Sequence, residues 1–310
     1  MKSDPTSIKR VASIDIGTNT ILLLIAEIDD DGLKPLFEKE TIVRLGEGLQ
    51  KNGVLSKEAM ERGFQTLAQY LERCQEMGVQ KIFAVGTSAL REAKNSVEFL
   101  NLVKEKMFLS IEVISGEEEA QLSFLAVAKD LKEIKEPVIV VDVGGGSTEF
   151  VLGEGDRVTQ WVSLPLGSVR FTEQFLISDP VREGEWERMD KEIGERLIDV
   201  PRPREPLSMV AVGGTATTLA SVEQGLKEFI PEKIHRFVLK KEALRNQLFL
   251  YRSKTIDERK KIPGLPPPRA DVILAGAAIL YRAMEELKCS SALVSCHGVR
   301  YGLLYKRLHL

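Results

Sequence analysis

Two strand–loop–strand segments of the same design lie 127 positions apart in the sequence, and this repeat limits the possible folds more than any other feature. The apolar run 11–14 ends in Asp-Ile-Gly-Thr-Asn-Thr, and the run 138–141 ends in Asp-Val-Gly-Gly-Gly-Ser-Thr-Glu. In each copy a second apolar run follows the loop, which is typical of a β-hairpin. The repeat therefore predicts two related halves, each beginning with a strand, a polar loop and a return strand.

Helical patterns alternate with strand-like runs after each hairpin. Apolar residues from Met60 to Cys74 recur at steps of three and four, which predicts a helix capped by Ser56. Further strands are expected at 81–86, 111–115, 209–212 and 292–295, and further helices at 95–108, 116–131 and 269–287, with a last one from 297 or 298 to the end. This alternation predicts an α/β layer architecture.

The length of 310 residues suits two domains, each with its own core. We place them at residues 1–125 and 126–310, because the second hairpin opens a new series of elements. This division leaves open whether the final helix packs back on the first domain.

Composition excludes several classes of protein. With 43 basic and 46 acidic residues the net charge is -3, so no overall positive field attracts nucleic acid or an anionic membrane. No apolar stretch reaches the length of a membrane-spanning helix or resembles a signal peptide, and three cysteines are too few for a disulfide scaffold. We expect a cytoplasmic protein without nucleic-acid or membrane partners, and the oligomeric state is left open.

Three glycine-containing loops each follow an apolar strand, at residues 15–20, 142–148 and 213–215. Backbone amides of glycine can surround phosphate oxygens, and Ser or Thr hydroxyls add further donors. One such loop also suits a tight hairpin, but three at strand ends favour phosphate binding. Neither the G-x-G-x-x-G pattern nor the P-loop pattern occurs at these strand ends, which excludes the Rossmann and P-loop interpretations.

Asp15 and Asp142 occupy equivalent positions, each at the end of a strand and the start of a glycine loop. A carboxylate in a turn commonly accepts hydrogen bonds from loop N–H groups. Mg²⁺ held by one or two carboxylates and water is the usual companion of a phosphate group. The symmetric pair favours a Mg²⁺ site, bound directly or through water.

Six segments together resemble the exopolyphosphatase / guanosine pentaphosphate phosphohydrolase family, within the superfamily of actin, Hsp70 ATPase domains and sugar kinases. They are D-I-G-T-N-T (15–20), V-G-T-S-A-L-R-E-A-K-N (85–95), S-G-E-E-E-A (115–120), D-V-G-G-G-S-T-E (142–149), G-G-T (213–215) and S-C-H-G-V-R-Y-G (295–302). The resemblance extends from Val11 to the final helix. Longer family members continue with a helical C-terminal region, so this chain is expected to be a short form, for which the tunnel and dimer contacts of that region are not assumed.

The resemblance implies two ribonuclease-H-like (actin-like ATPase) domains with a substrate cleft between them. It implies that Glu119 is the catalytic carboxylate that activates water, with Asp15 as the next candidate. Asp142 and Glu149 would engage Mg²⁺. The implied phosphate-binding residues are Gly17, Thr18, Asn19, Thr20, Arg91, Gly144, Gly145, Gly146, Ser147, Thr148, Gly213, Gly214 and Thr215.

Taken without the family, several of these residues have simpler interpretations. The run 117–119 fits a solvated helix start, because acidic residues are favoured in a first helical turn. Arg91 fits a surface position, and His297 fits a hydrogen-bonded structural histidine better than a metal ligand. With three histidines and no Cys-x-x-Cys, a zinc site is not expected.

Taken together, the residues and the resemblance predict a Mg²⁺-dependent phosphoanhydride hydrolase. It would release the terminal phosphate from inorganic polyphosphate, from guanosine pentaphosphate (giving guanosine tetraphosphate), or from both, by in-line attack of water. Two alternatives stay open: an ATP-dependent small-molecule kinase of the same superfamily, and a non-catalytic sensor that binds guanosine penta- or tetraphosphate.

Overall fold

The computed structural model describes residues 9–30, 32–133, 136–201 and 207–310, which form two compact units. Unit 1 runs to Ser115 and also contains Val299–Leu310, whereas unit 2 is the continuous segment Gly116–Gly298. The boundary predicted at residue 125 falls inside helix α5 (Gly116–Asp130), so the division lies earlier than predicted. The reason is that α5 packs along its whole length on strands of unit 2.

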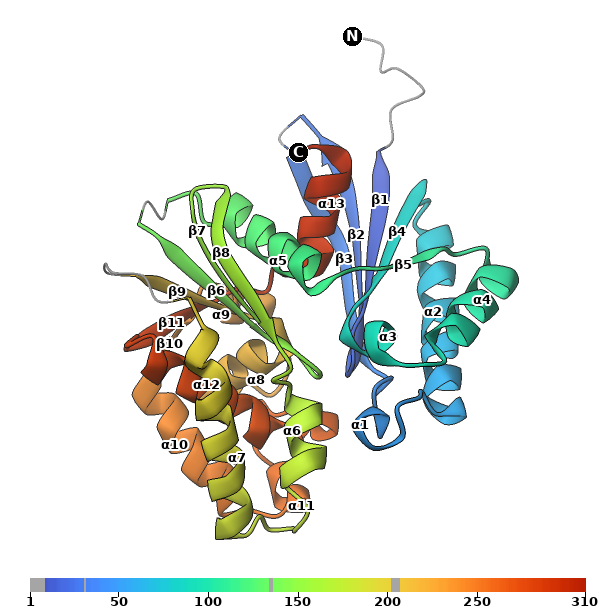
Figure 1. Cartoon of the computed structure of the whole chain (residues 1–310). Coiled ribbons are helices and arrows are strands. Elements are labelled where there is room, and N and C mark those ends of the chain that lie inside the picture. Colours follow the sequence, from blue (N-terminus) through green and yellow to red (C-terminus); the bar gives the residue numbers. More distant parts are fainter. Residues whose placement is uncertain (1–8, 31, 134–135, 202–206) are drawn as a thin grey trace. The chain divides into compact units, whose positions relative to one another are not determined.

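Unit 1 is built on one five-stranded sheet with the order β3-β2-β1-β4-β5 (Figure 1). Its strands are β1 (Arg10–Ile16), β2 (Thr20–Asp29), β3 (Gly32–Ile42), β4 (Lys81–Gly86) and β5 (Ile111–Val113). Its helices are α1 (Leu49–Asn52), α2 (Lys57–Glu76), α3 (Ser88–Glu92), α4 (Ser96–Met107) and α13 (Val299–Leu308). Helices α2 and α4 cover one face of the sheet and α13 the other, so the last helix does pack back on the first sheet.

The predicted helix after Ser56 is confirmed as α2. The Ser56 hydroxyl accepts a hydrogen bond from the N–H of Ala59, which satisfies one of the free donors in the first turn. Leu67 and Cys74 lie on the buried stripe of this helix, as their spacing predicted. Gly78, at φ 67°, follows the helix end in a conformation that suits glycine.

Unit 2 contains a six-stranded sheet with the order β10-β11-β9-β6-β7-β8. Its strands are β6 (Val138–Val143), β7 (Thr148–Glu154), β8 (Arg157–Leu164), β9 (Ser208–Val212), β10 (Val238–Lys240) and β11 (Ser291–Val294). Besides α5, its helices are α6 (Ser168–Phe175), α7 (Glu183–Arg196), α8 (Gly213–Glu223), α9 (Pro231–Ile234), α10 (Lys241–Arg252), α11 (Ile256–Arg259) and α12 (Ile273–Glu286). Within the described ranges, no helix has the length and apolar character needed to cross a membrane.

Side chains of strand β6 alternate between two hydrophobic clusters, one on each face of the sheet. Ile139 and Val141 join the larger cluster, to which α7, α8, α10 and α12 contribute. Val138 and Val140 point to the opposite face and pack with α5 residues that include Phe124. The same alternation places the next even-numbered residue, Asp142, on the face covered by α5.

Strand pairing within each unit repeats the 127-residue offset of the sequence. Asp15 on β1 lies opposite Leu22 on β2, and Asp142 on β6 lies opposite Glu149 on β7. The parallel pairs β1–β4 and β6–β9 keep the same offset. Since β3-β2-β1-β4-β5 and β8-β7-β6-β9-β11 have the same order, each unit is ribonuclease-H-like and the predicted repeat is confirmed. The predicted cleft between the domains stays a prediction.

Candidate active site

The first glycine loop of unit 1 is held by its own backbone. The Gly17 N–H donates to the Thr20 carbonyl over 2.9 Å, closing the turn between β1 and β2. The Asn19 carbonyl accepts two hydrogen bonds of 2.9 Å, from the N–H groups of Val43 and Arg44. The loop therefore has a fixed shape before any ligand binds.

Two side chains of this loop are buried although their polar atoms make no hydrogen bond within the described residues. They are Thr18, at its hydroxyl oxygen, and Asn19, at both atoms of its amide; Asn19 is 5% exposed. A buried polar group without a partner costs about 1–3 kcal/mol. Both residues were predicted to bind phosphate, and a ligand that accepts and donates hydrogen bonds here would recover that cost. Asp15, the last but one residue of β1, is also buried.

Arg91 lies on the short helix α3, as expected, and is anchored by backbone atoms of unit 1. Its Nη1 donates to the Ile114 carbonyl over 2.8 Å, and its N–H donates to the Thr87 carbonyl. Ile114 directly follows β5, close in sequence to the start of α5. The guanidinium is thereby fixed at the carboxyl end of the sheet, and Arg91 is half-buried.

The second glycine loop, in unit 2, repeats the hydrogen bond of the first. The Gly144 N–H donates to the Ser147 carbonyl over 3.0 Å, at positions equivalent to Gly17 and Thr20. Helix α6 packs directly against this loop: a Cβ built on Gly167 would lie 2.2 Å from the Gly145 carbonyl oxygen. A side chain at position 167 is thus excluded by the close approach of two backbones.

Two further residues support the second loop through its carbonyl groups. The Arg170 Nε donates to the Gly146 carbonyl over 2.6 Å, so a positive charge lies beside the loop. The Thr148 hydroxyl, predicted to contact phosphate, donates to the Leu166 carbonyl and serves the fold in this structure. Arg170 was not among the predicted site residues, because its partner is a backbone atom that no motif reveals.

Asp142 and Glu149 lie side by side on the sheet face that α5 covers, each bound by a serine hydroxyl. They are opposite one another in the β6–β7 register. Ser123 on α5 donates to Asp142 Oδ2 over 2.8 Å, and Ser163 on β8 donates to Glu149 Oε1 over 2.8 Å. Glu149 is only 1% exposed. The two predicted metal-binding carboxylates are therefore brought together.

Glu119 belongs to the same group by its position on α5. Glu119 lies four residues before Ser123, so both side chains are on the same face of the helix. Gly116 lies one turn before Glu119 and packs closely on β8, since a Cβ added to Gly116 would lie 2.8 Å from the Ser163 Cβ. Of the three consecutive glutamates, Glu117 is exposed and Glu119 is 8% exposed. The interpretation of the whole run as a solvated helix start is therefore wrong for Glu119. The predicted catalytic and metal-binding carboxylates share unit 2.

Burial raises the pKa of Asp142 above its ordinary value, and the hydrogen bond from Ser123 opposes that shift only partly. A carboxylate with a raised pKa lacks a cation that compensates its charge. Mg²⁺ prefers oxygen ligands of this type, and a nearby divalent ion would lower the pKa again. The donor set of Asp142 and Glu149 therefore fits the predicted Mg²⁺.

The third glycine loop begins helix α8 and comes very close to Asp142. Gly213 has φ +85°, and a Cβ at this residue would lie 2.6 Å from Asp142 Oδ1. A Cβ on Gly214 would lie 2.1 Å from Arg269 Nη2, so the buried Arg269 guanidinium rests on the first turn of α8. A helix N-terminus with a neighbouring arginine favours an anion. Arg269 was not among the residues predicted to bind phosphate.

The remaining predicted residue of this loop, Thr215, is buried against helix α12. A Cβ on Gly276 would lie 2.9 Å from the Thr215 hydroxyl oxygen, so glycine at 276 makes room for it. Arg300, another loop arginine, forms an ion pair with Glu38 inside unit 1. The positive charge of Arg300 is therefore paired with a carboxylate of the same unit.

Two ribonuclease-H-like units with glycine loops at equivalent strand ends define the class as an actin-like α/β protein. Within that class, the chain belongs to the Ppx/GppA phosphatase family, whose sequence model matches residues 24–310.

Solved structures of this family resemble the whole chain. A Ppx/GppA family member from Aquifex aeolicus is 38% identical, with a TM-score of 0.83 and 98% of each chain covered. An exopolyphosphatase from Cytophaga hutchinsonii is 28% identical, with a TM-score of 0.89 and coverage of 97% of this chain and 98% of that one.

One curated relative is considerably longer than this chain. A bifunctional 3-dehydroquinate synthase/phosphatase from Fusobacterium nucleatum is 35% identical over 286 residues. The match covers 88% of this chain and 43% of that protein, so the chain spans less than half the length of this relative.

Proposed function

We propose that the protein is a phosphoanhydride hydrolase that releases terminal phosphate from inorganic polyphosphate, guanosine pentaphosphate or both. Membership of a phosphatase family and likeness to an exopolyphosphatase support the class of reaction. The observation that carries the proposal is the grouping of Glu119 on helix α5 with Asp142 and Glu149 on the strands that this helix covers, beside the N-terminus of α8. Three carboxylates next to an anion-binding helix end suit hydrolysis of a phosphate chain.

Glu119 would orient the attacking water and accept its proton. The carboxylate is buried and lies in the first turn of α5, where the helix dipole favours its ionised form. Phosphoryl transfer needs little covalent help from the protein, so holding water in line is the main task. The neighbouring Glu117 is exposed and takes no part.

Asp142 and Glu149 would hold the Mg²⁺ ion. When bound, this ion neutralises charge on the phosphoryl oxygens in the transition state. Ser123 and Ser163 fix the two carboxylates by the hydrogen bonds described above. Each serine thus orients a ligand without touching the substrate.

The glycine loops of unit 2 and Arg269 would bind the phosphate oxygens. Gly213 and Gly214 allow a close approach because they have no side chains, and the unpaired N–H groups in the first turn of α8 point along the helix axis, out of its N-terminal end. Arg269 adds a positive charge at this point. In unit 1, Thr18 and Asn19 would contribute the partnerless polar atoms of the first loop.

The test is a phosphate-release assay of the purified chain with polyphosphate and with guanosine pentaphosphate, each with and without Mg²⁺. We expect Mg²⁺-dependent release from at least one of them in the absence of any acceptor, and loss of release in Glu119→Gln. Stoichiometric binding of guanosine pentaphosphate without turnover would instead support a sensor. Transfer from ATP to a small acceptor, with no release from polyphosphate, would support a kinase.

A further inference from the structure

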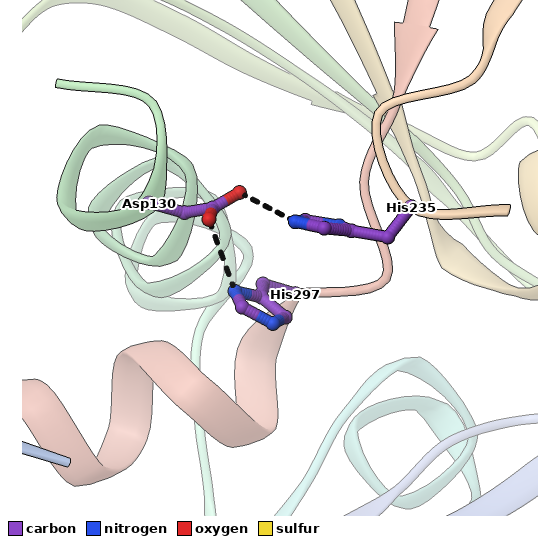
Figure 2. Close-up of side chains that lie close together, drawn as sticks. All are labelled: Asp130, His235 and His297. Carbon is purple, nitrogen blue, oxygen red and sulfur yellow. Dashed lines mark ion pairs between the residues drawn. The ribbon is translucent and has the colours of Figure 1, made fainter. Parts of the chain in front are cut away.

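A second group of ligand atoms lies in unit 2, at the other end of helix α5 from Glu119. It comprises Asp130, the last residue of α5; His235, which follows α9; and His297, between β11 and α13 (Figure 2). Among the described residues, this is the one group of three His, Cys, Asp or Glu side chains whose ligand atoms all lie within 4.8 Å of one another. The proposed phosphatase reaction uses none of them.

The distances suit a small ion. His235 Nε2 lies 3.2 Å from Asp130 Oδ2, and His297 Nδ1 lies 3.8 Å from Asp130 Oδ1. In a tetrahedral zinc site, ligands about 2.0–2.1 Å from the metal are about 3.3 Å from each other. The two imidazole rings are stacked, with centroids 4.6 Å apart, so both reach the same carboxylate from one side.

The Asp130 carboxylate is not satisfied by this arrangement. Its Oδ2 is buried, and its close contact with His235 Nε2 is an ion pair of 3.2 Å. Burial alone would raise the pKa of Asp130, but His235, His297 and Arg236 outweigh it and lower the pKa. An ionised carboxylate thus faces two imidazoles, one near each of its oxygens.

Arg236 is the competing cation at this place. Its Nη2 lies 3.3 Å from Asp130 Oδ1, and its Nη1 lies 2.8 Å from Glu133 Oε1. Two carboxylates and one guanidinium leave one negative charge around the group, which still attracts a cation. Removal of the guanidinium would expose Oδ1 fully.

We propose that Asp130, His235 and His297 bind one divalent ion of the zinc class, with water completing its coordination. Two imidazole nitrogens and one carboxylate oxygen favour Zn²⁺, Co²⁺ or Ni²⁺ over Mg²⁺, which prefers oxygen ligands alone. This site is separate in residues and in ligand chemistry from the carboxylates proposed to hold Mg²⁺.

Binding of the ion has a consequence for the backbone next to His297. The Cys296 N–H donates to His235 Nδ1 over 3.2 Å, so the neutral ring carries its proton on Nε2. An ion on Nε2 displaces that proton, and the ring stays neutral by taking a proton on Nδ1. Two N–H donors then face each other, and the hydrogen bond from Cys296 is lost. Occupation of the site therefore loosens the backbone just before Gly298, where unit 2 ends.

The experiment is a titration of the full chain with Co²⁺, followed by its visible d–d absorption, with Mg²⁺ as competitor. We expect one Co²⁺ per chain, no displacement by excess Mg²⁺, and binding weaker by on the order of tenfold or more in His235→Gln, His297→Gln and Asp130→Asn. His309→Gln is the matched control, because His309 is exposed and outside the group. Unchanged affinity in His235→Gln and His297→Gln would overturn the proposal.

Two further measurements keep the proposal testable if a ligand variant fails to fold. Arg236→Gln removes no ligand and should tighten Co²⁺ binding; binding that is unchanged or weaker would count against the geometry. Hydrogen exchange at the Cys296 amide should quicken when Zn²⁺ is added to the wild-type chain, and an amide that becomes better protected would overturn the backbone coupling. Cys296→Ser should bind Co²⁺ as the wild type does, since the thiol is not among the proposed ligands.

Discussion

The Ser123 hydroxyl donates a 2.8 Å hydrogen bond to Asp142 Oδ2 and so ties helix α5 to strand β6. This bond opposes the effect of burial, which raises the pKa of Asp142. In Ser123→Ala the pKa should rise further, because only the ionised form was stabilised by the hydroxyl. If ionised Asp142 is needed for activity, the acid limb of the kcat/KM profile moves to higher pH. Ser253→Ala, at an exposed hydroxyl, should leave the profile in place.

Asp142→Asn should separate activity from stability. Loss of the charge proposed to hold Mg²⁺ is expected to lower turnover on the order of 100-fold or more. Folding raises the pKa of Asp142, so above that pKa the ionised carboxylate destabilises the folded state. Without Mg²⁺ at pH 7, Asp142→Asn should therefore melt at a higher temperature than the wild type. The difference should shrink as the pH falls through the folded-state pKa. Thermal melts across pH check this, and a lower melting temperature at pH 7 contradicts it.

Glu119→Gln should lower kcat by about 10²–10⁴-fold, the usual contribution of a general base, with a small change in KM. Glu117→Gln and Glu118→Gln are the controls, since they change the same turn of the same helix. Steady-state kinetics on the preferred substrate provide the measurement. Equal effects in all three variants would show that only the charge of the turn matters, and Asp15 would become the next candidate.

Gly213→Ala should cost both stability and activity. The added Cβ would lie 2.6 Å from Asp142 Oδ1 in a backbone at φ +85°. Gly225→Ala has a similar φ of +60° but open space around it, so it measures the backbone cost alone, about 1 kcal/mol. Gly213→Ala should have a much lower free energy of unfolding in urea and a much lower rate of phosphate release than Gly225→Ala. Indistinguishable variants would remove the contact with Asp142 from the site.

Asn19→Ala and Asn95→Ala should have opposite effects. The Asn19 amide is buried without a partner, so its loss should leave the free energy of unfolding almost unchanged and raise KM. The Asn95 side chain bonds both the N–H and the carbonyl of Leu55, so its loss should cost about 1–3 kcal/mol and spare KM. A large loss of stability in Asn19→Ala would mean that the amide serves the fold.

The repeat was predictable because special residues mark it. Asp142 and Gly144 stand at fixed distances from Asp15 and Gly17, and the strand register keeps those distances. Strands β3 and β8 were not predicted, because both are edge strands with many exposed residues and no regular apolar alternation. The apolar stripe of α5 predicted a helix but not which sheet it covers, and that choice decides the unit to which Glu119 belongs. Arg269 was not among the predicted phosphate-binding residues, because its neighbour is the backbone of Gly214, which no motif reveals.

During synthesis the two units receive their last residues in a different order from their first. Unit 2 is one uninterrupted segment, whereas unit 1 needs both its first 115 residues and helix α13. A ribosome therefore delivers everything unit 2 requires before it delivers the last element of unit 1. Until α13 emerges, the face of β1 that this helix covers stays open, and Ser13 lacks the Arg300 carbonyl to which its hydroxyl donates. The N-terminal sheet is therefore synthesised first but completed last. We expect this sheet to be the part of the nascent chain that is most exposed to chaperones and to aggregation.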